Sequence, residues 1–423
     1  MSATLPVRPA TDRDIPAWQR HLRAGVERRL GALRHGGLRL VETWSGRRRT
    51  LGAGAPVATL RVHDPGFYPD LALGGSVGAA ESYAAGDWDC DDLPALVALM
   101  VAHRDVLDGL ESGLARLSAP LRKLAHLARP NSRRGSRRNI AAHYDLGNEF
   151  FELFLDETLT YSCALFERED QTLAEASTAK LERLCRKLGL APGMRLLEIG
   201  CGWGSFALHA ARHHGVQVTA TTISSRQYER ARERVSAAGL ADRVTILHED
   251  YRDLTGSYDR IASIEMIEAV GHAQIPTLLG AFGRLLEPDG LLGLQAITIA
   301  DQHYDRARRQ VDFIKRHIFP GSVIPSVTAI TTAATRASDL RLLHLEDFGP
   351  HYARTLAAWR RNLGDRRGEA RGLGYDESFL RLWDFYLAYC EGGFAERFLG
   401  LAQMVFARPG ARPDPILCPS VLR

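Results

Sequence analysis

The chain has 423 residues, of which 45% are hydrophobic and 25% are charged, and its formal net charge is +4. This composition is typical of a folded globular protein and excludes an intrinsically disordered chain, while the length favours two domains over one. No apolar run reaches the roughly 18 residues that a membrane-spanning helix needs, and the first residues lack the apolar core of a secretory signal. We therefore expect a cytoplasmic protein.

The cysteines show no metal-binding or disulfide pattern. The six are scattered and none belongs to a C-x-x-C pair, so the sequence predicts neither a metal site nor a set of disulfides. They are Cys90, Cys163, Cys185, Cys201, Cys390 and Cys418.

Residues 1–130 are expected to form a smaller α+β domain. The apolar pattern predicts helices at 15–33 and 93–103, and strands at 38–41 and 57–62. No catalytic constellation is visible in this part of the chain.

A basic segment follows at residues 116–138. Between Ser112 and Tyr144 the chain has no acidic residue but eight basic ones, and leucines interleave with the first of these at helical spacing. One interpretation is a solvated helix followed by a domain linker at 131–138. Another is a contact with an anionic membrane surface, to which each basic side chain contributes about 1 kcal/mol. Nucleic acid is disfavoured as a partner, because interleaved aromatic residues are missing.

Residues 139–423 alternate between strands and helices. The predicted strands lie at 194–199, 216–222, 243–248, 258–264 and 290–299. This alternation predicts a doubly wound parallel α/β sheet that binds its ligand at the carboxyl ends of the strands. Two helices, at 351–363 and 376–390, and a final strand at 401–407 follow.

The first of these strands runs into a turn that contains Gly200, Gly202 and Gly204. Glycines allow the backbone to turn tightly and to approach a ligand where a Cβ atom would clash. The spacing differs from the G-x-G-x-x-G of dinucleotide dehydrogenases, and the strand at 216–222 does not end in the carboxylate that holds a ribose in those enzymes. The turn is compatible with S-adenosylmethionine at least as well as with a dinucleotide.

Several ordered segments carry a family resemblance. They are 139–166, Thr222–Gln227, Glu265–Gly271, Phe319–Gly321 with Pro325–Ser326, and Cys390–Phe394. Together they closely resemble the cyclopropane-fatty-acyl-phospholipid synthase family, which includes the mycolic-acid cyclopropane synthases, over residues 139–408. Residues 1–130 resemble more loosely the lipid-binding N-terminal domain of the bacterial phospholipid enzymes. The resemblance implies a class I methyltransferase domain at 139–423 that uses S-adenosylmethionine.

The resemblance also implies which residues bind the methyl donor. Tyr161 and Ser162 would close over it, and the three glycines would border its methionine and ribose parts. Thr222 and Gln227 would take the ribose side, and Asp250 with Tyr251 would lie beside the adenine. Glu198, at the end of the first strand, completes the expected donor-binding set.

The chemistry requires a base as well as a donor. Methylation of an isolated cis double bond leaves a carbocation in the acyl chain, and a base must then remove a proton. In the enzymes that the chain resembles, a bicarbonate ion is that base. Its holders here would be Cys163, Glu268, Tyr352 and the backbone of Ile297. Gln295 occupies a position where the family usually has a histidine.

Two products are compatible with this chemistry. Loss of a proton from the added methyl group closes a cyclopropane, which we expect as the product, whereas loss from the neighbouring chain carbon gives a methylene branch. The segments around Gln295 and at Glu265–Gly271 are similar to a sub-branch that makes methylene- or methyl-branched fatty acids. A separate reductase would then be a partner.

The predicted substrate is the unsaturated acyl chains of membrane phospholipids. The enzyme would be peripheral on the inner face of the cell membrane, and the family leads us to expect a homodimer. The alternatives are a soluble small-molecule methyltransferase and a non-catalytic lipid-binding protein. The presence of Glu268, Cys163 and Tyr352 argues against the second alternative.

Overall fold

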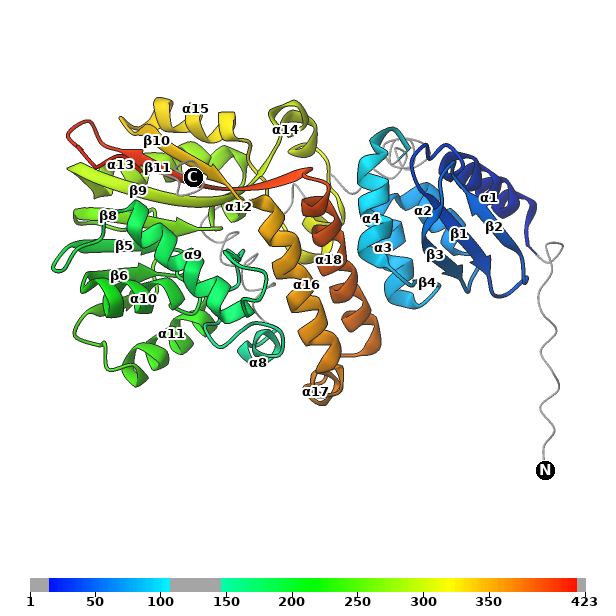
Figure 1. Cartoon of the computed structure of the whole chain (residues 1–423), viewed down its shortest axis with the longest axis horizontal. Helices are drawn as coiled ribbons and strands as arrows, with labels where there is room; N and C mark the ends of the chain where they lie inside the picture. The colour runs from blue at the N-terminus through cyan, green and yellow to red at the C-terminus, as the bar shows by residue number, and fades with distance from the viewer. Residues whose placement is uncertain (1–14, 107–145, 417–423) are drawn as a thin grey trace. The chain divides into compact units, whose positions relative to one another are not determined.

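The computed structural model describes residues 15–106 and 146–416, so the basic segment at 116–138 lies outside the described residues. The chain forms two compact units, which Figure 1 shows in colours that follow the sequence. The first takes the described part of Met1–Ala125 together with Val311–Arg316 and Gly374–Glu396. The second takes the rest of the described chain.

The first unit combines helices with a four-stranded sheet. Its helices are α1 (Ala17–Leu30), α2 (Phe67–Gly74), α3 (Ser76–Ala85), α4 (Leu93–Ala102) and α18 (Glu377–Ala395). Its strands are β1 (Gly37–Glu42), β2 (Arg48–Leu51), β3 (Pro56–Val62) and β4 (Trp88–Cys90), in the order β2-β1-β3-β4. The predicted helices at 15–33 and 93–103 and strands at 38–41 and 57–62 are confirmed. Elements α2, α3, β2 and β4 were not predicted.

Helix α18 packs within the first unit, although the sequence analysis placed its residues with the methyltransferase domain. The Arg381 guanidinium donates to the backbone carbonyls of Tyr83 (2.6 Å) and Trp88 (2.8 Å). Gly392 faces α4 so closely that an added Cβ atom would lie 2.8 Å from the Val97 Cβ atom. The glycine of this motif therefore permits helix packing, and burial raises the pKa of the neighbouring Cys390 thiol.

The second unit is built on a seven-stranded sheet in the order β10-β11-β9-β8-β5-β6-β7. Its strands are β5 (Arg195–Ile199), β6 (Gln217–Thr221), β7 (Val244–Leu247), β8 (Tyr258–Ile264), β9 (Leu286–Ile299), β10 (Arg341–Asp347) and β11 (Leu399–Ala407). The five strands β5 to β9 are parallel. Strand β11 pairs antiparallel with β9, and β10 pairs antiparallel with β11. The predicted doubly wound sheet is confirmed, and the edge strand β10 was missed.

Helices follow most of these strands. They are α8 (Asn148–Glu152), α9 (Leu173–Lys187), α10 (Ser205–His214), α11 (Ser225–Ala237), α12 (Ile267–Val270), α13 (Ile275–Leu285), α14 (Asp301–Ala307), α15 (Val327–Ala337), α16 (Gly349–Asp365) and α17 (Arg367–Gly372), with short 3₁₀ and π turns at His272–Gln274 and Ile314–Ile318. None of the helices in the described ranges is long and apolar enough to cross a membrane.

Two apolar cores cover the two faces of the large sheet. On one face, strand residues such as Leu196 and Val218 pack against α9, α10 and α11. On the other, residues such as Leu197 and Ile261 pack against α13 and α15. Adjacent strand residues point to opposite faces, so burial on both sides explains why the parallel strands are continuously apolar. The carboxyl ends of the strands are left to carry polar side chains.

Candidate functional site

The glycine turn lies at the carboxyl end of β5, and its three glycines all adopt a positive φ: 85° at Gly200, 52° at Gly202 and 83° at Gly204. A Cβ atom at Gly200 would lie 2.6 Å from the Cγ atom of Met266, so this position requires close packing. A Cβ atom at Gly202 would meet nothing within 4 Å. At Gly202 the chain therefore combines a glycine backbone with open space beside the sheet edge.

The residues predicted to hold the ribose and the adenine follow the next two parallel strands. Thr222, just after β6, donates a 2.9 Å hydrogen bond to the Gln227 side-chain carbonyl. Asp250, after β7, is held by the Arg252 guanidinium at 2.6 and 2.8 Å. Burial raises the pKa of the Tyr251 phenol. Because carboxyl ends of parallel strands meet at one edge, the fold brings these residues to the edge that carries the glycine turn.

Glu198 is a buried acid at the end of β5. Burial raises its pKa to about 8, although a hydrogen bond from the Ala207 backbone and the charge of Lys180 oppose the shift. Its Oε2 atom has no hydrogen-bond partner among the described residues. An orphaned buried oxygen beside the glycine turn is a group that a bound molecule can satisfy.

Tyr161 and Ser162 lie on the segment before α9. The Tyr161 ring packs against aromatic rings, with centroids 5.2 Å from those of Phe151 and Trp359. The ammonium group of Lys180 donates to the Ser162 hydroxyl at 2.6 Å. Lys180 is fully buried on α9, where burial lowers its pKa and the charge of Glu265 opposes that shift, and this hydrogen bond holds its amino group next to the predicted donor-binding residues.

A buried carboxylate that the sequence analysis did not single out, Glu265, joins most of the predicted base-site residues. The Cys163 backbone N–H (3.0 Å) and the Gln295 side-chain amide (2.7 Å) donate to its Oε1 atom. The Tyr352 hydroxyl donates to its Oε2 atom at 2.6 Å. Glu265 follows β8 with a positive φ of 49°, which is unusual for a residue other than glycine.

Glu268 lies one helical turn later, at the start of α12. Its Oε1 atom accepts the Ile297 backbone N–H at 2.5 Å. Its Oε2 atom is buried and has no hydrogen-bond partner among the residues that the structure describes. Burial, together with the charge of Glu265, raises the pKa of Glu268 to about 8. Below about pH 8, Glu268 is therefore mainly protonated.

The orientation of Gln295 is set by a chain of polar side chains. The Gln403 amide donates to the Gln295 carbonyl at 2.9 Å, and the Lys187 ammonium donates to the Gln403 carbonyl at 2.9 Å. Gln295 and Gln403 face each other in the register of β9 and β11. Because its carbonyl is occupied, the Gln295 amide group points its N–H toward Glu265.

Five residues were predicted to bind bicarbonate. In the structure, the hydrogen-bond donors of four of them contact carboxylates of the chain. The Cys163 N–H, the Gln295 amide and the Tyr352 hydroxyl contact Glu265, and the Ile297 N–H contacts Glu268. This arrangement does not fit a bicarbonate ion, since its donors already have acceptors. Burial raises the pKa of the Cys163 thiol, so Cys163 contributes its backbone and not a thiolate.

The sequence analysis also missed Gln403 and Lys180. Gln403 lies on β11 and Lys180 on α9, both among apolar residues, where a buried polar side chain needs a partner. A polar residue within an otherwise apolar stretch is the sequence signal that would have identified both.

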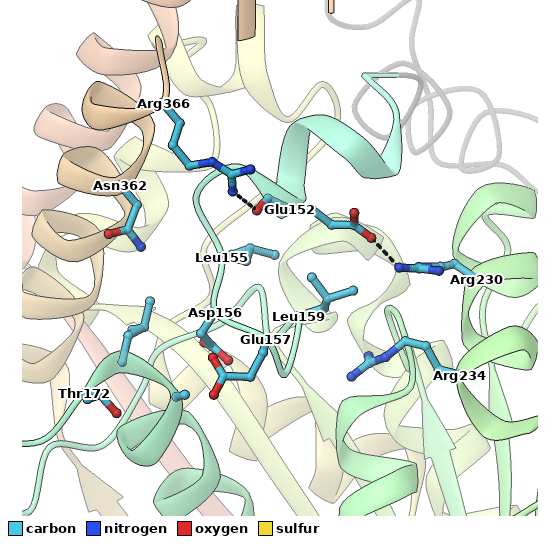
Figure 2. Close-up of a pocket in the computed structure, with 12 residues that line it drawn as sticks. Glu152, Leu155, Asp156, Glu157, Leu159, Thr172, Arg230, Arg234, Asn362 and Arg366 are labelled. Carbon is cyan, nitrogen blue, oxygen red and sulfur yellow. Dashed lines mark hydrogen bonds and ion pairs between the residues drawn. The ribbon is translucent and has the colours of Figure 1, made fainter. Parts of the chain in front are cut away.

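A separate pocket of about 680 Å³ lies next to the turn, and Figure 2 shows its lining. Arg234 donates to the backbone carbonyls of Trp203 (2.7 Å) and Thr158 (2.8 Å), which fixes the turn to the segment that leads to Tyr161. Arg230 pairs with Glu152 at 2.7 Å. Arg234 therefore supports the glycine turn, and none of the predicted site residues lines the pocket.

The sequence is similar to those of several known proteins. The sequence profile of the family described as mycolic acid cyclopropane synthetase matches residues 131–404. The chain is 38% identical, over 85% of its length and 86% of the relative's, to the tuberculostearic acid methyltransferase UfaA1 of Mycobacterium tuberculosis. It is 37% identical, over 84% of its length and 89% of the relative's, to the cyclopropane-fatty-acyl-phospholipid synthase of Escherichia coli.

Solved structures give the same result. The mycolic acid cyclopropane synthase CmaA1 complexed with SAH and CTAB matches with a TM-score of 0.60 and 33% identity, covering 64% of this chain and 98% of that one. Coclaurine N-methyltransferase matches with a TM-score of 0.58 at 20% identity, covering 78% of this chain and 98% of that one, which shows the shared methyltransferase fold alone.

We predict that Gly202→Ala weakens S-adenosylmethionine binding by at least tenfold, or about 1.4 kcal/mol, because the added methyl group enters the open space beside the sheet edge. Gly193→Ala is the matched control. Gly193 also has a positive φ, 83°, and also has nothing within 4 Å of an added Cβ atom.

Both variants should lose about 1–2 kcal/mol of unfolding free energy, since alanine is strained in this backbone region. Calorimetric titration of the donor separates the two effects. Equal donor affinity in the two variants would contradict the placement of the donor at Gly202.

Proposed function

The chain belongs to the mycolic acid cyclopropane synthetase family, and on that premise we propose that it transfers a methyl group from S-adenosylmethionine to the cis double bond of an unsaturated lipid acyl chain. The observation that carries the proposal is the buried carboxylate of Glu265, held by three donors at the sheet edge beside the glycine turn. The reaction needs a binding site for the methyl donor and a buried base close to it.

The residues at the glycine turn fit the methyl donor. The open space beside Gly202 and the orphaned oxygen of Glu198 would be filled by it, with Thr222 and Gln227 on its ribose side. When bound, S-adenosylmethionine supplies an electrophilic methyl group. Tyr161 and the aromatic side chains around it add π faces that attract positive charge in the acyl chain.

Glu265 acts as the base in this proposal. The methyl carbon would form a bond to one alkene carbon as its bond to the sulfonium sulfur breaks and S-adenosylhomocysteine leaves. The other alkene carbon becomes a carbocation, and the carboxylate removes a proton from the substrate. The electron pair of the broken C–H bond then closes either a ring or a new double bond. A buried carboxylate supplies charge in a low-dielectric site, where it attracts a cation more strongly than it would in water.

The two neighbouring acids would divide the acid and base roles. Glu265 receives three hydrogen bonds and faces the buried ammonium of Lys180, whereas Glu268 receives only the backbone N–H of Ile297 among the groups described. Burial raises the pKa of both carboxyls, but the donors around Glu265 stabilise its anion. The two environments therefore favour the proton on Glu268 and the anion on Glu265.

Loss of the proton from the added methyl group gives a cyclopropane, which is the product that we propose. A methylene branch is the second candidate product. It is supported by the similarity to the tuberculostearic acid methyltransferase over 85% of the chain. In that case a separate reductase would complete the methyl branch. Both products arise from one cation, so the position of Glu265 relative to the acyl chain decides between them.

We also propose that the enzyme works as a peripheral protein on the cytoplasmic face of the membrane, as a homodimer. The eight basic residues between Ser112 and Tyr144 support the membrane contact, since they would attract an anionic lipid surface. An acyl tail must leave the bilayer to reach a buried carboxylate, so docking shortens its path.

Incubation of the purified protein with S-adenosylmethionine and vesicles of cis-monounsaturated phospholipid tests the reaction. We expect the released acyl chains to gain one carbon by mass spectrometry. Proton NMR then distinguishes the isomers: strongly shielded ring protons identify a cyclopropane, and exocyclic methylene protons identify the branched product. Unchanged acyl chains would contradict the proposed function and indicate a soluble acceptor.

The membrane contact has its own test. Reversing the charge of Arg133, Arg134, Arg137 and Arg138 should abolish flotation of the intact chain with anionic vesicles, because each basic side chain contributes about 1 kcal/mol near such a surface. Reversal of four exposed arginines of the second unit, Arg212, Arg232, Arg336 and Arg341, changes the net charge by the same amount and is the control. Flotation that is equal in both variants would contradict the docking role of the basic segment.

A further inference from the structure

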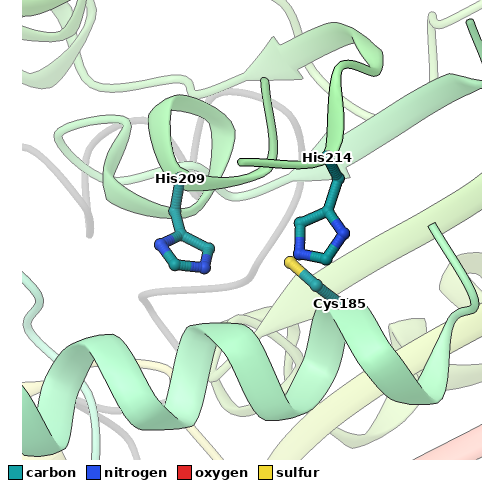
Figure 3. A group of neighbouring side chains, drawn as sticks. All are labelled: Cys185, His209 and His214. Atoms are coloured by element: carbon teal, nitrogen blue, oxygen red, sulfur yellow. The ribbon is translucent and has the colours of Figure 1, made fainter. Parts of the chain in front are cut away.

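A cluster of metal-ligating side chains lies between α9 and α10, and the proposed reaction does not use it. It consists of Cys185 on α9 and of His209 and His214 on α10, whose ligand atoms all lie within 4.8 Å of one another (Figure 3). Cys185 is fully buried, and the two histidine side chains are 10% and 17% exposed. Solvent therefore reaches the cluster past the two imidazoles and not past Cys185.

A fourth donor meets the same two imidazoles. Glu182 precedes Cys185 by three residues on α9, so the two side chains share a helix face. The Nε2 atoms of His209 and His214 lie 3.1 and 3.0 Å from the same Glu182 oxygen, Oε2. Two imidazoles that converge on one carboxylate oxygen, with a sulfur atom beside them, form a compact set of four donors.

We propose that Glu182, Cys185, His209 and His214 bind a zinc ion that joins α9 to α10. One thiolate, two imidazoles and one carboxylate are the ligand types that zinc takes in tetrahedral sites, at about 2.3 Å for sulfur and about 2.0–2.1 Å for nitrogen. The ligand atoms of Cys185, His209 and His214 already lie within 4.8 Å of one another, and the Glu182 oxygen lies 3.0–3.1 Å from both imidazoles, so small side-chain rotations reach such distances.

The pKa shifts of the proposed ligands are compatible with a site that releases a proton when it binds a metal ion. Burial lowers the pKa of His209, which favours the neutral imidazole that a metal requires. Burial works against the Glu182 carboxylate, but hydrogen bonds from Arg186, His214 and His209 lower its pKa to about 2. Burial raises the pKa of the Cys185 thiol, so zinc binding must release the thiol proton to solvent.

The cluster escaped the sequence analysis because its ligands come from two helices separated by β5. C-x-x-C spacing, which that analysis looked for, places zinc ligands within a single loop. The role that the position suggests is structural. Helix α10 begins at the glycine turn and α9 carries Lys180 and Lys187, so the metal would tie together two helices that frame the site.

Titration of the intact chain with Co²⁺, a spectroscopic probe for zinc sites, tests the proposal. We expect saturable binding at one ion per chain with a thiolate-to-cobalt charge-transfer band, and displacement of the cobalt by Zn²⁺. Cys185→Ser should lose the charge-transfer band, whereas Cys90→Ser, which changes a cysteine of the other unit, should keep it.

A second pair of variants keeps the test valid if the buried Cys185→Ser change impairs folding. His214→Ala should weaken Co²⁺ binding by more than about tenfold, since even outer-shell partners of metal ligands contribute that much. His213→Ala is the matched control, because it removes the neighbouring imidazole but leaves all four donors. Zn²⁺ should also raise the thermal unfolding midpoint of the wild type and of His213→Ala, but not of His214→Ala.

Two results would overturn the proposal. One is a wild-type chain that binds no Co²⁺ or shows no charge-transfer band. The other is equal Co²⁺ affinity in His213→Ala and His214→Ala. These readouts do not depend on methyl transfer, so they are independent of the proposed function.

Discussion

The catalytic end of the sheet depends on one buried carboxylate whose charge must be balanced. Glu265 is half-buried, and burial raises the pKa of its carboxyl, so an unpaired carboxylate in this place would be costly. Three hydrogen bonds and the nearby ammonium of Lys180 offset that cost. The donors come from the segment before α9, from β9 and from α16, so the charge ties distant parts of the chain to the end of β8.

This constraint reaches into the sheet itself. Gln295 donates to Glu265 while its carbonyl accepts from Gln403, and that pairing exists because β9 and β11 place the two residues opposite each other. A shift of β11 by one residue would turn the Gln403 amide to the other face of the sheet, away from Gln295. This chain of hydrogen bonds ends at the Lys187 ammonium on α9. Lys187 thus orients Gln403 on β11 and, through it, Gln295 on β9.

Much of the fold could be predicted from the sequence, because strands such as Arg195–Ile199 and helices such as Leu173–Lys187 have clear apolar patterns. The half-exposed edge strand at Arg341–Asp347 has no such pattern and was missed. The glycine turn was predictable because its residue types are constrained by backbone shape. The role of Glu265 was not, since sequence alone does not show which acid the backbone of Cys163 and the hydroxyl of Tyr352 will meet.

The central claim is that Glu265 replaces an external base, and its most direct test is the Glu265→Gly variant assayed with and without bicarbonate. Glycine tolerates the positive φ of 49° and leaves the three donors around an empty place. We predict wild-type methyl transfer that is independent of bicarbonate. The variant should lose about 10²–10⁴-fold without the ion and recover part of that loss when it is added, with unchanged donor affinity. A wild type that needs bicarbonate, or a variant fully active without it, would contradict the account.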